Sequence, residues 1–142
     1  MLTFNHRLFL QPVLLLMMFF SLSMKPSGDT DGSAEGDLFR EIENAIGLGN
    51  AKLLSAHMSS SVELDIPGSE GVYSRPQSEQ ILNKFFNKYP PTSFILSHKG
   101  NSAAGSKFAV GDYVTGKEQT FRVTIFLKKT GEHYLIHEIE FQ

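Results

Sequence analysis

The sequence contains no cysteine, and this absence excludes several classes of protein. Disulfides cannot form, so the fold must be held together by its apolar core alone. A structural zinc site built from thiolates is excluded for the same reason. A bacterial lipoprotein carries its lipid on a cysteine at the cleavage site, so the chain is not a lipoprotein.

Charge is also scarce, at 20% of residues, and the formal net charge is only −2. A nucleic-acid-binding protein should be strongly basic, so we expect no nucleic-acid partner. Familiar catalytic and metal motifs are absent too: the sequence has no phosphate-binding loop, nucleophile elbow, HExxH motif or complete calcium loop. We therefore expect neither a metal nor a cofactor.

The first 24 residues combine a positive start with an apolar run. Arg7 precedes residues 8–24, which carry no charge. This pattern predicts a Sec signal peptide and hence export to the periplasm or the medium. The alternative is an uncleaved anchor, which would be the only membrane contact, although the run is short against the roughly 20 apolar residues of a comfortable span.

Residues 25–36 are rich in Gly, Ser and Asp and contain no large apolar side chain, which predicts a flexible linker. The remaining residues, 37–142, have the size of one domain. In this part, Asp37 is expected to cap a first helix that ends at Gly47, and Asn50 begins a short second helix.

A third helix is predicted from the capping box formed by Ser74 and Gln77, and Pro90-Pro91 ends it. Alternating polarity predicts strands at 62–66, 72–73, 93–99, 107–115, 119–129 and 133–141. Helices set beside a mainly antiparallel sheet define an α+β domain.

Two side chains on these strands matter for function. In 119–129, Phe126 is the one large apolar residue on the polar side. In 133–141, alternation places His137 on the apolar face with Leu135, Ile139 and Phe141.

The order of these elements resembles the nuclear transport factor 2-like superfamily, also called ketosteroid-isomerase-like and cystatin-like. The segments GVYSRPQSEQILNKFF, PPTSFILSHKG, GSKFAVGDY, FRVTIFLKK and YLIHEIEF resemble a small exported bacterial family of domains of unknown function. The resemblance implies a strongly curved sheet that wraps around the helices and leaves a conical pocket. Because this superfamily contains enzymes, adaptors and plain binding modules, the fold does not decide the function.

Asp65 is the catalytic candidate, since it lies in the region that resembles the site of the general base in ketosteroid isomerases. Such a site needs the base beside an apolar pocket, together with a tyrosine and a neutral acid that hold the oxyanion. The sequence departs from this pattern because the first helix contains no tyrosine. The alternative is that Asp65 caps the turn at Pro67-Gly68.

His137, Tyr113 and His98 are the candidate ligand-binding residues. A histidine on the apolar face could line a pocket, although a buried histidine with one hydrogen bond is the structural alternative. Tyr113 could direct its hydroxyl into the same pocket, or it could be a half-buried core residue. His98 ends the first long strand and could lie near His137.

Two functions are consistent with the sequence. The first is a non-enzymatic binding module of the bacterial envelope, which takes a small apolar ligand inside or docks a second copy or another protein on the outer sheet face at Phe126. The alternative is a lyase or isomerase that uses Asp65 as general base, with His137 or Tyr113 polarising the substrate. A third outcome is that the 12 phenylalanines fill the cone and leave no internal site.

Overall fold

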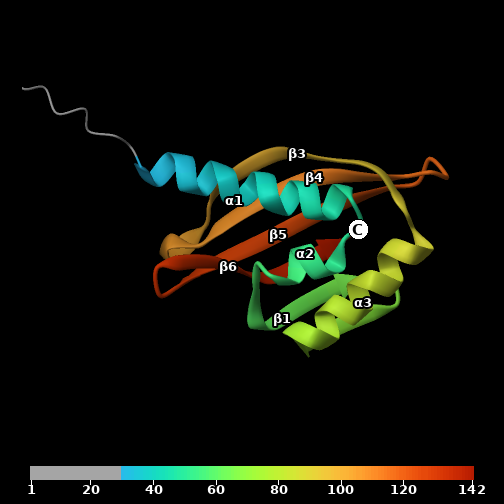
Figure 1. Cartoon of the computed structure of the whole chain (residues 1–142), viewed down its shortest axis with the longest axis horizontal. Helices are drawn as coiled ribbons and strands as arrows, with labels where there is room; N and C mark the ends of the chain where they lie inside the picture. Colours follow the sequence, from blue (N-terminus) through green and yellow to red (C-terminus); the bar gives the residue numbers. More distant parts are fainter. Residues whose placement is uncertain (1–29) are drawn as a thin grey trace, which may run out of the picture. The chain divides into compact units, whose positions relative to one another are not determined.

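The computed structural model describes residues 30–142, so the predicted signal peptide and the start of the predicted linker lie outside the described residues. The elements are α1 (Thr30–Gly47), α2 (Ala51–Ser55), β1 (Met58–Ile66), β2 (Ser69–Ser74), α3 (Arg75–Lys88), β3 (Pro91–Asn101), a 3-10 turn η1 (Ala103–Gly105), β4 (Lys107–Thr115), β5 (Thr120–Thr130) and β6 (His133–Phe141). The helices lie on the same side of the sheet (Figure 1). None of the described helices is both long and apolar enough to span a membrane.

The six strands form one curved sheet in the order β2-β1-β6-β5-β4-β3. Neighbouring strands are antiparallel except β1 and β6, which run parallel. The first strand of the chain therefore lies beside the last, and this long-range pairing joins the β1–β2 hairpin to the four-stranded meander. The α+β class and the mainly antiparallel sheet are confirmed.

Helix α3 begins and ends where the sequence predicts. The backbone N–H of Ser74 donates to the Gln77 side chain at 3.0 Å, and the Gln77 N–H donates to Ser74 Oγ at 3.4 Å. These reciprocal bonds satisfy amides that the first turn of a helix otherwise leaves unpaired. The helix stops at Lys88, before Pro90 and Pro91.

Helix α1 begins earlier than predicted, at Thr30, so residues 30–36 are helical rather than part of a flexible linker. Asp37 is inside the helix and does not cap it; its carboxylate accepts a hydrogen bond from Arg40 Nη2 at 2.6 Å. The added turns are fixed from outside, because Lys107 Nζ on β4 lies 2.7 Å from Glu35 Oε2. Such a tertiary contact is invisible in the local composition on which the linker prediction rested.

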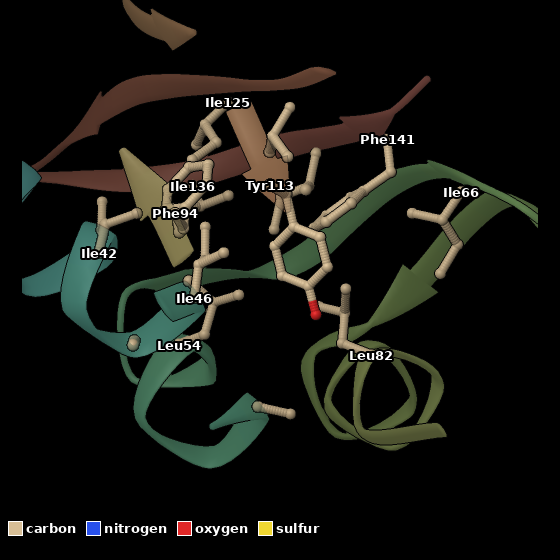
Figure 2. Close-up of a cluster of buried hydrophobic side chains, with 14 of the residues drawn as sticks. Ile42, Ile46, Leu54, Ile66, Leu82, Phe94, Tyr113, Ile125, Ile136 and Phe141 are labelled. Atoms are coloured by element: carbon tan, nitrogen blue, oxygen red, sulfur yellow. The ribbon is translucent and has the colours of Figure 1, made fainter. Parts of the chain in front are cut away.

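Aromatic rings fill the space between the helices and the inner face of the sheet. The ring of Phe85 on α3 has five aromatic neighbours, with centroids between 4.6 and 6.0 Å away. These neighbours are Phe86, Tyr89, Tyr113, Phe121 and Phe141. Figure 2 shows Tyr113 in the middle of the cluster, surrounded by aliphatic side chains from α1, α2 and the strands. The interior therefore corresponds to the third outcome given above, in which phenylalanines fill the cone.

A β-bulge in β6 overturns the predicted alternation of the last strand. Phe126 on β5 lies opposite Glu138, but the next residue, Leu127, lies opposite Ile136, so His137 is an extra residue in the ladder. Ile136 is fully buried as a result, whereas His137 is only partly covered. The prediction that His137 and Leu135 share the apolar face with Ile139 and Phe141 is wrong, because the extra residue shifts the alternation and Ile136 faces the core in their place.

Candidate functional site

Tyr113 is a core residue, in agreement with the structural alternative. Its side chain is fully buried, and its hydroxyl donates a hydrogen bond to the Tyr89 carbonyl oxygen at 2.5 Å. Burial raises the pKa of this hydroxyl above its ordinary value because the charged form would be poorly solvated. The hydroxyl is thus already satisfied within the core and is not directed into a pocket.

The two candidate histidines lie apart. His137 occupies the bulge of β6, where burial and the charge of Lys128 lower its pKa. His98 is exposed on β3, and its ring centroid lies 5.6 Å from that of Phe108. Since β4 and β5 separate β3 from β6, the structure does not bring the candidate ligand-binding residues together.

Asp65 lies on the outer face of the sheet. Its neighbours Leu64 and Ile66 are buried in the core, so the Asp65 side chain projects to the opposite side. In the register of the sheet it stands between Glu70 of β2 and Glu140 of β6. A general base for enolisation needs an apolar pocket, whereas the positions on either side of Asp65 are held by carboxylates. The geometry therefore offers no support for the lyase or isomerase alternative.

The outer face of β3–β5 carries a group of apolar side chains, which we call the apolar strip. It consists of Ile95, Phe108, Val110 and Phe126. Phe108 and Phe126 stand directly opposite each other on β4 and β5, and Ile95 is 64% exposed. A Cβ atom at Gly100 would lie 2.8 Å from the Phe108 ring, so the missing side chain lets this ring lie against β3.

The same face carries acidic side chains on β2, β1 and β6, which we call the carboxylate block. Its members are Glu63, Asp65, Glu70, Glu138 and Glu140. The register places like charges opposite each other three times: Glu63 with Glu138, Asp65 with Glu140, and Asp65 with Glu70. Like charges at directly opposite positions destabilise a sheet, so this arrangement lowers the stability of the fold.

The pKa of Glu138 is raised above its ordinary value. Burial is the largest cause, and a hydrogen bond with Glu140 and the negative charges of Glu63 and Glu140 raise the pKa further. Lys128 is the cation that opposes the effect. The ion pairs found among residues 30–142 do not include any member of the block.

The strip and the block adjoin, because Phe126 of the strip stands directly opposite Glu138 of the block. Sequence reasoning identified Phe126, and it singled out Asp65 as a catalytic candidate, but it missed the block as a whole. Its signal was present as acidic residues at alternate positions, Glu63 with Asp65 and Glu138 with Glu140. Recognising it requires the parallel pairing of β1 with β6, which local patterns do not reveal.

In residues 30–142, no group of three histidine, aspartate or glutamate side chains is close enough to hold a metal ion. The carboxylates of the block form a negatively charged surface on the outer face of the sheet. Together with the apolar strip, they make the outer face of the sheet the candidate functional site.

A curved, mainly antiparallel sheet with helices on its inner face defines an α+β domain of the nuclear transport factor 2-like and cystatin-like class. A designed NTF2 protein matches the fold with a TM-score of 0.63 at 15% identity, over 79% of this chain and 99% of the design. A cystatin-like domain of unknown function from Nostoc punctiforme matches with a TM-score of 0.61 at 12% identity, over 80% of this chain and 77% of its own. At these identities the likeness concerns the fold alone.

Within this class, the chain belongs to the family described as domain of unknown function DUF4783, whose model matches residues 39–142. A member of this family from Bacteroides ovatus is 30% identical, with a TM-score of 0.66, over 71% of this chain and 90% of its own. A comparison with curated proteins gave no match. The resemblance to a family of unknown function and to the nuclear transport factor 2-like fold is thereby confirmed.

Proposed function

We propose that this domain is a non-enzymatic protein-binding module of the bacterial envelope, and that it docks its partner on the outer face of the sheet. The observation that carries the proposal is the apolar strip lying directly beside the carboxylate block on one face. The location in the envelope rests on the predicted signal peptide.

The inner face supports the proposal by offering little room for a ligand. Its side chains pack against the helices, and the rings around Phe85 occupy the centre. On the outer face, by contrast, the described residues leave Phe108 and Phe126 only partly covered. Apolar side chains that sit together on a surface, rimmed by polar ones, are typical of a protein-interaction site.

Charge defines the chemistry of the partner. The carboxylates repel one another on the free domain, and basic side chains brought against them would relieve this repulsion. A second copy would present the same carboxylates, so packing block against block would add repulsion. We therefore favour a partner of different sequence, with apolar side chains for the strip and lysine or arginine for the block, over the homodimer.

The spacing of the strands sets the dimensions of that partner. Strands lie about 4.8 Å apart, so Phe126 on β5 and Glu63 on β1 are about 10 Å apart across the sheet, with β6 between them. Apolar and basic side chains at this separation fit a two-stranded edge, an amphipathic helix or an extended peptide. A stable complex would cover about 800 Å² on each partner.

The test uses a peptide of alternating lysine and leucine as the probe, with a peptide of alternating glutamate and leucine as its charge control. The proposal predicts that the domain binds the first peptide and not the second, as measured by isothermal titration calorimetry in 0.15 M NaCl. Phe126→Ser and the double variant Glu63→Gln/Glu138→Gln should each weaken the binding about tenfold, since each removes one half of the recognition.

The matched controls are Leu48→Ser and Glu118→Gln, which change an exposed leucine and an exposed glutamate away from the sheet face. Neither should change the binding. Equal affinity for the two peptides, or equal weakening by the controls, would overturn the proposal. A dimer that dissociates on Phe126→Ser in sedimentation velocity would instead identify the occupant of the face as a second copy.

A further inference from the structure

A groove of about 590 Å³ lies at one end of the sheet, separate from the outer face. It runs between residues 34–38 of α1, the two residues that follow α2, and the β5–β6 hairpin. Leu38, Ala56, Tyr134 and Leu135 form its apolar part. The volume falls within the range of ordinary small-molecule sites, and the groove is distinct from the filled centre of the fold.

One side of the groove is closed by groups that satisfy each other. Lys107 Nζ lies 2.7 Å from Glu35 Oε2 and 3.2 Å from Asn101 Oδ1, and it stands 4.9 Å from the centre of the Tyr134 ring. The Tyr134 hydroxyl donates to the Gly105 carbonyl oxygen at 3.3 Å. These contacts join α1 to β4 and β6, and they leave the apolar surface of the Tyr134 ring as one wall of the groove.

The hairpin side carries polar groups without such partners. Lys129 and His133 line the groove, and neither takes part in an ion pair among the described residues. His57, also in the lining, lies 3.6 Å from Glu41 through Nε2. Two carboxylates line the groove. Glu35 is paired with Lys107, whereas Glu132 is exposed at the turn and would repel an anion.

We propose that this groove binds a small amphiphilic acid. Its apolar body lies on Leu38, Tyr134 and Leu135, and its anionic head receives hydrogen bonds from Lys129 and His133. Charge-assisted hydrogen bonds to a carboxylate or sulfonate suit these two donors, and the apolar part suits a short alkyl chain or a single ring system. This site is independent of the partner surface proposed above, because its lining does not include the strip or the block.

The test uses anilinonaphthalene sulfonate as a fluorescent probe, since it combines an aromatic body with an anionic head. Octanoate, octanol and octylamine then compete for the site with the same alkyl chain and three different heads. We expect octanoate to displace the probe about tenfold more effectively than octylamine, because only the acid can use the donors of the hairpin.

The chain supplies a matched pair of control lysines. Lys129→Gln should weaken probe binding about tenfold, whereas Lys128→Gln, at the neighbouring position outside the groove lining, should leave it unchanged. Glu132→Gln should strengthen the binding, because it removes the opposing charge. Phe126→Ser should have no effect, which separates this site from binding on the outer face.

Equal displacement by octanoate and octylamine would overturn the proposal, and so would equal affinity of Lys129→Gln and Lys128→Gln for the probe. Loss of probe binding in Phe126→Ser would show that the probe binds the sheet face instead. Each of these results can occur with or without binding of the lysine–leucine peptide, so failure here is distinguishable from failure of the proposed function.

Discussion

The two faces of the sheet differ in how well their side chains are satisfied. On the inner face, strands and helices bury side chains that satisfy one another, down to the Tyr113 hydroxyl on the Tyr89 carbonyl. On the outer face, Phe126 remains partly uncovered beside Glu138, whose charge is opposed by its neighbours. The inner face is built for stability, whereas the outer face carries features that cost stability. Features of the second kind are the ones that indicate function.

The largest difference between the faces should appear on truncating one phenylalanine from each. Phe85→Ala removes a ring with five aromatic neighbours and should lower the free energy of unfolding by about 3–5 kcal/mol. Phe126→Ala, at a partly exposed position, should lower it by about 1 kcal/mol or less. Urea denaturation of both variants measures the difference, and equal losses would contradict the division into two faces.

A smaller loss is expected from Tyr113→Phe, which leaves the Tyr89 carbonyl without its donor in the core. The cost should be about 1–2 kcal/mol in urea denaturation at neutral pH.

The same variant has a pH signature. Because burial raises the pKa of Tyr113, the stability that this residue contributes is complete below its unfolded pKa of about 10 and is lost as the pH rises through the higher folded value. Above pH 10, the wild type should therefore lose stability more steeply than Tyr113→Phe. If the stability of the two proteins fell equally above pH 10, ionisation of this hydroxyl would not be coupled to unfolding.

On the outer face, we expect a substitution that raises the free energy of unfolding rather than lowering it. Glu138→Gln removes one of the repelling charges and should stabilise the domain at pH 7 by a few tenths of a kcal/mol. Since the folded pKa of Glu138 is raised, the wild type is favoured below about pH 4 and loses this advantage as the pH rises through the folded value. The gain of the variant should therefore vanish at low pH. A destabilised Glu138→Gln at pH 7 would mean that the block stabilises the free domain.

A similarly small effect concerns an exception on the inner side. Ser78 on α3 is fully buried, and its hydroxyl has no hydrogen-bond partner among residues 30–142. Ser78→Ala removes an unsatisfied polar atom and introduces a better helix former. Thermal unfolding should show a stabilisation of about 0.5 kcal/mol. A clear destabilisation would show that the hydroxyl has a partner in solution.

Local sequence signals predicted most of the fold because local chemistry determines most of its boundaries. The capping box at Ser74 begins α3 because it pairs the free amides of the first turn. The prolines after Tyr89 end the helix because proline has no backbone N–H to donate. The alternation of Phe121–Leu127 correctly identified the inner face of β5. These signals need no knowledge of distant segments.

The errors arose where distant segments decide the structure. The start of α1 depends on Lys107, more than seventy positions away in the chain. The bulge at His137 depends on how β6 meets β5 and β1, and it moved this residue off the core face. The carboxylate block appears only when β1 and β6 pair in parallel. The candidate site was therefore the part least accessible to sequence reasoning, which pointed to it only through Phe126 and through Asp65, the latter in a catalytic role that the geometry does not support.

The central claim is that the outer face binds a basic, apolar partner. The most direct test follows the amide chemical shifts of the protein during titration with the lysine–leucine peptide in 0.15 M NaCl. We predict that the shifts change along β4, β5, β6 and β1, centred on Phe126 and Glu138, while α3 and the groove remain unaffected. Shifts confined to the helices or to the groove, or no shifts at all, would contradict the claim.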